Sequence, residues 1–389
     1  MPQPSTTFQS PTVDPLDLPE MLRPAIEAAA DESERCGDIP AQLYAELRDA
    51  GAFRLLTPRE QGGLETPLTT TMKVYEAFGR IDASVAWIVW NANFGCLGAL
   101  LPESGVARLW AAGEPAFANS GMPGRAKRTD GGFRISGRWR IVSGVHRAEW
   151  VSLVAIVMDG DMPATNSSGG PDVRFFLTHK NALTVLDTWN VSGMRGSGSH
   201  DVVVEDAFVP DELVAPVDLP SRIDRPLYRG YPQSLVVPGC TAIVLGVAQA
   251  AIDEMVRMAP GKKDPSGKAL SEQHRARVAL ARSDTSLRAA RLLLHSVLGD
   301  LQAVAELGGT VSTEQKSDLW AAMAHAAQVC RKVLVDMYEL GSSASIYRSE
   351  ALERIFRDGM VALQHANHSA KHFESVGAVL FGDAPLSGF

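Results

Sequence analysis

Helix-forming and strand-forming segments are segregated along this chain instead of alternating. Residues 15–112 are rich in Ala and Leu with helical periodicity, and residues 219–389 contain long amphipathic runs of the same period. Between them, residues 113–218 alternate β-branched and aromatic residues with polar ones. Because a doubly wound α/β fold needs alternating strands and helices, this order predicts an α+β fold. We expect an N-terminal helical domain, a middle antiparallel β-barrel-like domain and a C-terminal four-helix bundle within these bounds.

The charge and hydropathy of the chain argue against several classes of partner. A net charge of -8 over 389 residues disfavours nucleic acid or an anionic membrane as the main partner. No run of about 18 apolar residues is present, so we expect no membrane-spanning helix. Residues 1–19 are polar and Pro-rich, unlike a signal peptide, and we expect a cytoplasmic protein.

The spacing of cysteines and histidines indicates no metal site. The four cysteines are far apart and form no CxxC pair, which fits a reducing compartment without structural zinc. His365, His368 and His372 have a metal-like spacing, but no carboxylate or cysteine cluster accompanies them. We therefore expect no bound metal.

Four strings in the right order resemble the acyl-CoA dehydrogenase superfamily across nearly the whole chain. They are "ELRDAGAFRLLTPREQGG", "ISGRWRIVSGVHRAEWVSLVAIV", "WNVSGMRGSGSHDVVVEDAFVP" and "LERIFRDGMVAL". The resemblance implies a flavin held between the β domain and the helix bundle, and a small-molecule substrate. It also implies a homotetramer, since family members usually pair through their bundles.

The resemblance also assigns residues to the flavin. Ser143 would lie near the N5 edge of the ring, Ile141 and Val142 against the ring, and Ser120 near its pyrimidine side. Without the resemblance, Ser143 is a turn serine before a glycine. Other candidates would approach the ring or hold the flavin phosphate: Arg195, Ser197 and Ser199 in "MRGSGS", Arg275, Ser342 and Ser345. The family's "RQ.FG" string, which helps to hold FAD, is not recognisable, and this favours FMN over FAD.

An acyl-CoA dehydrogenase needs a carboxylate that removes a proton from its substrate, and this chain lacks one at both family positions. The usual position lies eight residues after Asp358 and is occupied by Ala366. The second lies early in the bundle, where residues 225–252 contain no Asp or Glu.

A histidine stands beside the empty position. The string "RIFRDGMVALQHANH" resembles the last helix of the flavin-dependent monooxygenase branch of the superfamily, and it places His365 at the reactive edge of the flavin. In that branch reduced flavin and O2 form a C4a-hydroperoxide, which needs a dry pocket and hydrogen bonds. By this resemblance Ser143 and His365 are the catalytic candidates, for hydroxylation or for N- or S-oxygenation. Alternatively, His365 is a polar residue packed at a helix interface.

Three further residues are candidates for the substrate pocket: Asn91, Asn93 and His368. Either Asn is equally well explained as a capping or packing residue. No GxGxxG fingerprint appears, so we expect a separate NAD(P)H-dependent flavin reductase to supply the reduced flavin. Two alternatives remain, namely a flavin dehydrogenase or oxidase with an unusual base, and a non-catalytic oligomeric homologue.

Overall fold

The structure, a computed structural model, describes residues 13–166, 169–217, 221–230 and 232–385. Its N-terminal part is helical and consists of α1 (Leu18–Cys36), α2 (Ala41–Asp49), α3 (Leu68–Ile81), α4 (Ala83–Ala92) and α5 (Glu103–Leu109). Asp82 caps α4, because its side chain accepts a hydrogen bond from the backbone N–H of Val85 at 2.9 Å. All ten residues of α4 are buried, so this helix lies inside the molecule.

The middle part is one eight-stranded sheet with the order β6-β7-β2-β1-β3-β5-β8, and β4 pairs with β3. Its strands are β1 (Phe117–Thr129), β2 (Gly132–Val142), β3 (Trp150–Asp159), β4 (Met162–Pro163), β5 (Val173–His179), β6 (Thr184–Leu186), β7 (His200–Pro210) and β8 (Val214–Pro216). The prediction of an antiparallel sheet is confirmed for every pair except β1 and β3, which run parallel. The sheet is mixed because β2 returns along one edge of β1, and the chain then crosses to the other edge.

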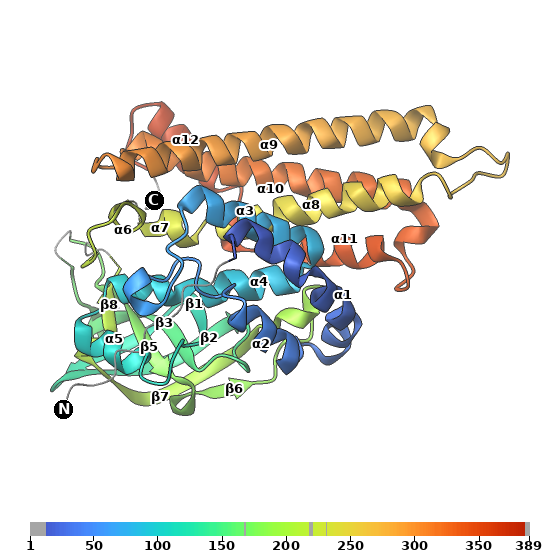
Figure 1. The fold of residues 1–389 in the computed structure, drawn as a ribbon. Helices are drawn as coiled ribbons and strands as arrows, with labels where there is room; N and C mark the ends of the chain where they lie inside the picture. Colours follow the sequence, from blue (N-terminus) through green and yellow to red (C-terminus); the bar gives the residue numbers. More distant parts are fainter. Residues whose placement is uncertain (1–12, 167–168, 218–220, 231, 386–389) are drawn as a thin grey trace.

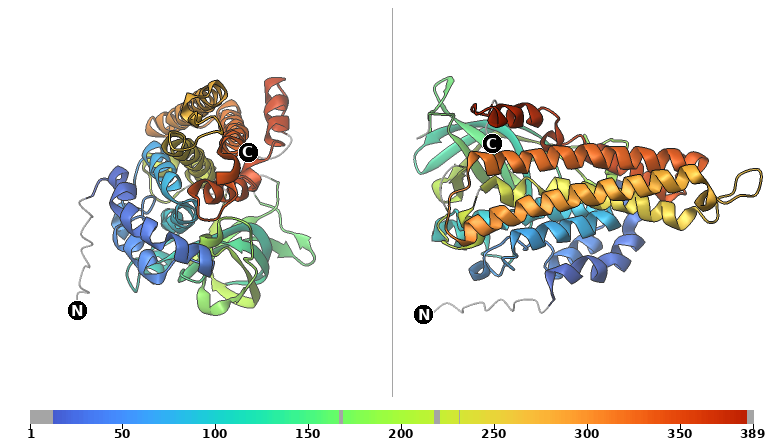
Figure 2. Two further views of the ribbon diagram at one scale, coloured as in Figure 1. Left: turned by 90° about the vertical axis from the view of Figure 1, so that its right-hand side faces the viewer. Right: turned by 90° about the horizontal axis from the view of Figure 1, so that it is seen from above.

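The C-terminal part is the predicted bundle, formed by α8 (Gly239–Met258), α9 (His274–Glu306), α10 (Thr313–Gly341) and α11 (Ala351–Ala362). The short α6 (Pro226–Arg229) and α7 (Pro232–Val236) precede it, and α12 (His372–Leu380) packs on α10. Figure 2 shows α9 and α10 side by side along the length of the bundle.

One stretch, Gln233–Met258, is long and apolar enough to cross a membrane, contrary to the expectation from the sequence. However, 72% of its most apolar window is buried inside the molecule, because α3, α10 and α11 pack around α8. Its apolar character is therefore explained by its position as the central helix of the bundle.

The three parts are stacked so that α4 lies between the sheet and the bundle (Figure 1). The N-terminal helices and the bundle share one hydrophobic core, and the sheet has a second core. Close approach of α3 and α8 requires Gly246, since a Cβ there would lie 2.0 Å from the carbonyl oxygen of Glu76. Residues on α4 can therefore contact both layers, and the site is built around this helix.

Candidate functional site

His365 lies between α4 and the end of the bundle, in contact with two tryptophans. Its ring centroid is 5.7 Å from that of Trp87 and 5.6 Å from that of Trp90, and both pairs are edge-on. The indole N–H of Trp90 donates to the backbone oxygen of Val236 at 2.7 Å. These contacts place the turn after α11, the helix α4 and the end of α7 around one imidazole.

Burial decides the protonation state of His365. It lowers the pKa of the imidazole to about 4, so the ring is neutral at neutral pH. Nδ1 lies 3.3 Å from the backbone N–H of Asn367 and accepts a hydrogen bond from it. The remaining proton of the neutral ring is therefore on Nε2, which can donate a hydrogen bond. His365 thus acts as a neutral donor, not as a group that titrates near pH 7.

His368, predicted in the substrate pocket, is held by the protein itself. Its Nε2 lies 3.2 Å from the hydroxyl of Thr241 on α8, and its Nδ1 lies 3.2 Å from the carbonyl oxygen of Ala362. Since a carbonyl only accepts, Nδ1 carries the proton and Nε2 accepts from the threonine. Burial lowers the pKa of His368 to about 3. This side chain ties the end of the chain to α8 and does not line the cavity described below.

The end of the sheet that faces α4 carries two exposed apolar side chains, Met122 and Ile141, beside the buried Ser120, and we call these three residues the sheet-end patch. The Ser120 hydroxyl donates to the backbone oxygen of Arg140 at 3.3 Å and accepts from the N–H of Met122 at 3.4 Å. Met122 and Ile141 are 48% and 52% exposed, although they are large and apolar. Ile141 also has a φ of 58°, which is strained for a β-branched residue.

Val142 and Ser143 follow Ile141 and are both buried. The Val142 side chain points into the core of the sheet, so it does not belong to the sheet-end patch. The Ser143 hydroxyl lies 2.8 Å from that of Ser199, which lies 2.7 Å from that of Ser197. The structure thus joins three predicted flavin residues, Ser143, Ser199 and Ser197, by hydrogen bonds.

The two asparagines of the predicted substrate pocket have structural partners. Asn91 donates to the carbonyl oxygen of Trp87 at 2.8 Å, and its own side-chain oxygen accepts from Asn119 of β1 at 2.8 Å. Asn93 donates to the carbonyl oxygens of Ala52 and Val89, each at 2.8 Å. Asn91 therefore joins α4 to the sheet, and Asn93 closes the end of α4.

The remaining cofactor candidates do not contact the serines or His365 through their side chains. Arg195 donates to the carbonyl oxygen of Glu34 at 2.9 Å and so binds α1. Arg275 is exposed at the start of α9, and Ser342 and Ser345 follow the end of α10, at the opposite end of the bundle from α12 (Figure 1). The Ser345 hydroxyl donates to the carbonyl oxygen of Tyr338 at 2.7 Å. Arg195 shares its turn with Ser197, but its side chain is directed to α1. The structure does not bring Arg275, Ser342 and Ser345 together with Ser143 and His365.

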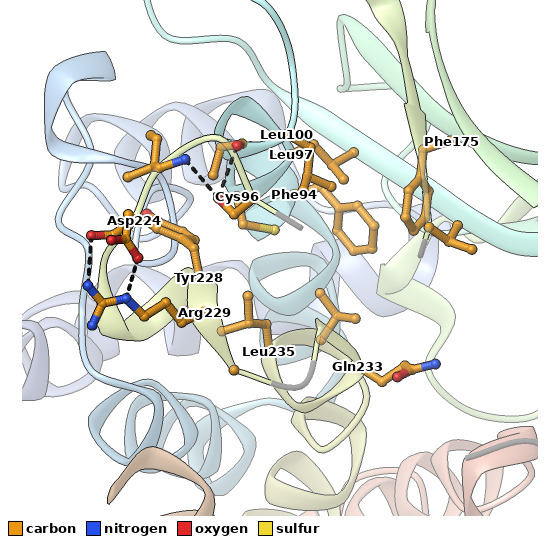
Figure 3. Close-up of a pocket in the computed structure, with 16 residues that line it drawn as sticks. Phe94, Cys96, Leu97, Leu100, Phe175, Asp224, Tyr228, Arg229, Gln233 and Leu235 are labelled. Carbon is orange, nitrogen blue, oxygen red and sulfur yellow. Dashed lines mark hydrogen bonds and ion pairs between the residues drawn. The ribbon is translucent and has the colours of Figure 1, made fainter. Parts of the chain in front are cut away.

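A cavity of about 290 Å³ opens beside the Trp90–Val236 contact, between the segment after α4, the strand β5 and the helices α6 and α7. Its walls are mostly apolar, and Figure 3 shows the aromatic rings of Phe94 and Phe175 side by side on one of them. Their centroids are 6.5 Å apart at 75°. The main lining residues, none of them among the sequence-based candidates, are Phe94, Leu97, Phe175, Tyr228, Leu235 and Val236. No local signal identifies them, since they are ordinary apolar residues from four separate segments.

The residues present fit a flavin ring, which is a flat plate with polar edges. The sheet-end patch offers two uncovered apolar side chains beside the hydroxyl of Ser120, and the indoles of Trp87 and Trp90 on α4 contact the imidazole of His365. Ile141, Met122, Ser120 and Ser143 would hold the ring, and His365 would face its reactive edge. Neither family position offers a base: Ala366 is present at one, and the first acids of α8, Asp253 and Glu254, pair with Arg80 and Arg257.

Comparison with known proteins agrees with this geometry. The model of the acyl-CoA dehydrogenase N-terminal domain matches residues 19–105, and that of the C-terminal domain matches residues 239–370. Indole-3-acetate monooxygenase of Acinetobacter baumannii is 29% identical over 93% of this chain and 92% of that protein. The pigment production hydroxylase of Rhodococcus erythropolis is 25% identical over 92% of this chain and 93% of that protein.

Solved structures show the same fold. XiaF from Streptomyces sp., in complex with FADH2 and glycerol, has a TM-score of 0.87 and 26% identity over 96% of each chain. Dibenzothiophene monooxygenase from Paenibacillus sp. has a TM-score of 0.81 over 96% of this chain and 99% of its own, at 20% identity. The chain therefore belongs to the flavin-dependent monooxygenase branch of the acyl-CoA dehydrogenase superfamily.

Proposed function

We propose that this protein is the oxygenase component of a two-component monooxygenase that inserts one oxygen atom into a small, uncharged aromatic molecule. The observation that carries the proposal is the contact of Trp90 with both His365 and Val236, which joins a neutral hydrogen-bond donor to an aromatic-lined cavity. The volume of about 290 Å³ suits a fused bicyclic ring such as indole. The indole-3-acetate monooxygenases among the relatives support this size class.

Each residue has a role that follows from its surroundings. Reduced flavin, when bound, supplies the two electrons with which O2 is split between product and water. Phe94 and Phe175 hold the aromatic ring of the substrate, and Trp87 and Trp90 keep water away from the reacting atoms. The Nε2–H of His365 donates a hydrogen bond to oxygen atoms that gain negative charge during the reaction. Ser143 would contribute its hydroxyl at the N5 edge of the ring.

The reduced flavin comes from a separate NAD(P)H-dependent reductase. The chain contains no dinucleotide fingerprint, and relatives carry the names "oxygenase subunit" and "oxygenase component". The missing "RQ.FG" string supports FMN as the flavin, whereas the FADH2 of XiaF is an observation in favour of FAD. Equilibrium titration with FMNH2 and FADH2 without oxygen decides between them, and we propose that FMNH2 binds more tightly. Exposed apolar residues on α9 and at the C-terminal end, such as Leu292 and Phe381, support a homotetramer. A cytoplasmic location stays a proposal.

The decisive experiment combines the protein with a flavin reductase, NADH, O2 and indole. We expect an oxygenated product and little H2O2. His365→Ala should keep the fold and flavin binding but release most of the consumed O2 as H2O2. Bleaching of bound flavin by an acyl-CoA, without any oxygenation, would instead indicate a dehydrogenase. If the chain binds neither reduced nor oxidised flavin, it is a non-catalytic homologue.

A further inference from the structure

Three buried serines form a continuous chain of hydrogen bonds behind the sheet-end patch. The Ser143 and Ser199 hydroxyls are 2.8 Å apart, the Ser199 and Ser197 hydroxyls 2.7 Å apart, and Ser197 donates to the carbonyl oxygen of Met194 at 2.8 Å. All three serines are at most 2% exposed. Water therefore does not compete for these bonds, and the chain of serine hydroxyls is a fixed part of the structure.

The carbonyl at the end of the chain fixes the direction of every proton. A carbonyl oxygen only accepts, so the single proton of the Ser197 hydroxyl is committed to Met194. The proton in the next contact must then come from Ser199. For the same reason the proton between Ser143 and Ser199 must come from Ser143. The hydroxyl of Ser143 consequently has no proton left to donate, and it meets any further group with its lone pairs.

The carbonyl is itself held in place. The indole N–H of Trp189 also donates to the Met194 oxygen, at 3.0 Å, and the Met194 N–H donates to Asp358 at 2.6 Å. Met194 and Gly198, which flank the serine-bearing turn, have φ values of 56° and 51°. The N–H of Gly144 donates to the carbonyl oxygen of Ser197 at 2.9 Å, which ties Ser143 to the same turn.

We propose that Ser199 and Ser197 are positioning residues that hold the Ser143 hydroxyl as a hydrogen-bond acceptor. Reduced flavin carries a hydrogen on N5, whereas N5 of oxidised flavin is an acceptor. An acceptor at Ser143 therefore matches the reduced form and opposes the oxidised form. The proposal rests on the proposed function, because it takes Ser143 as the residue at the N5 edge.

The test is the ratio of dissociation constants for oxidised and reduced FMN, measured by equilibrium titration without oxygen. In Ser199→Ala the Ser143 hydroxyl is free to turn and donate, so this ratio should fall about two- to tenfold, the range of one hydrogen bond. Ser143→Ala should lower it similarly. The double variant should show no additional fall, because Ser199 acts only through Ser143. Ser197→Ala should also lower the ratio, by a smaller factor.

Ser152→Ala is the matched control, since Ser152 is fully buried in the same sheet and its hydroxyl has no hydrogen-bond partner among the described residues. Its ratio should equal that of the unaltered protein. If the ratio is unchanged in Ser199→Ala but lowered in Ser143→Ala, Ser199 does not position the Ser143 hydroxyl and the proposal is wrong. Additive effects in the double variant would also overturn it, as they would indicate independent packing defects. Failure of the unaltered protein to bind flavin or oxygenate indole would contradict the proposed function instead.

Discussion

The carboxylate of Asp358 accepts a hydrogen bond from the backbone N–H of Met194 at 2.6 Å, across 164 positions of sequence. This bond joins α11 to the loop before β7, and the same loop carries Ser197 and Ser199. Seven residues after Asp358 the chain reaches His365. One short segment therefore both anchors the loop that carries Ser197 and Ser199 and bears the imidazole of His365. The "RD" pair in the last helix of the bundle has a structural purpose that does not depend on a catalytic base.

The protonation of Asp358 should make stability depend on pH. Burial, followed by the nearby charge of Asp82, raises its pKa from 3.8 to about 7. The buried, protonated Asp358 carboxyl therefore contributes fully to stability below about pH 4, and this contribution is lost as the pH rises through 7. Asp358→Asn keeps an oxygen acceptor for Met194 without titrating. We expect its free energy of unfolding, relative to the unaltered protein, to increase between pH 5 and pH 8, on the order of 1–3 kcal/mol.

Urea denaturation at the two pH values measures this difference. Asp358→Ala removes the acceptor as well and should be less stable than Asp358→Asn at both pH values. A stability difference between Asp358→Asn and the unaltered protein that does not vary with pH would contradict the raised pKa.

The same loop is pressed against α11 at Gly193. A Cβ at this position would lie 2.4 Å from the backbone oxygen of Arg357, and the backbone cannot move aside cheaply. We expect Gly193→Ala to lower the free energy of unfolding by about 1–3 kcal/mol and to lower flavin affinity with it. Gly121→Ala, in open space on β1, is the control and should change stability little. Equal stability of the two variants would show that the loop does not dock as described.

The lowered pKa of His365 predicts how coupling depends on pH. With a pKa of about 4, the ring stays neutral from pH 6 to pH 9, so the fraction of O2 that reaches product should be constant as far as this residue is concerned. His365→Gln retains a neutral N–H donor and should keep more coupling than His365→Ala, by about two- to tenfold. The measurement is the ratio of product to H2O2 at each pH. A loss of coupling centred near pH 6.5 that disappears in His365→Gln would contradict a neutral histidine.

The sequence predicted the order of domains well because hydrophobic periodicity reflects which face of each element is buried. The parallel pairing of β1 with β3 was not predictable, since periodicity carries no information on which edge a strand joins. His365, Ser143 and Ser197 were identifiable only through family strings. Asn93, Arg195 and His368 bind other parts of the protein, and the sequence could not show this because these partners are distant in sequence. The cavity could not be predicted for a similar reason, because its apolar walls come from segments as far apart in the sequence as Phe94 and Val236.

The charge at the cavity predicts which substrates it accepts. Among the described lining residues the charged ones are Asp224 and Arg229, and they form an ion pair, drawn as dashed lines in Figure 3. Hydrogen bonding to Arg229 lowers the pKa of Asp224, so the pair stays charged and the lining is neutral overall at pH 7. An aromatic carboxylate such as indole-3-acetate therefore finds no unpaired cation there, whereas indole needs none.

Asp224→Asn leaves the guanidinium of Arg229 without its counter-charge. We expect the KM for indole-3-acetate to fall about threefold at low ionic strength, with little change for indole, and the effect to fade as salt is added. Arg229→Gln in the same background should restore the original preference, because the attraction depends on that one cation. Initial rates with both substrates at two salt concentrations give the comparison. If the two KM values fall together, the variant has changed the shape of the cavity and not its charge, and the ion pair does not select the substrate.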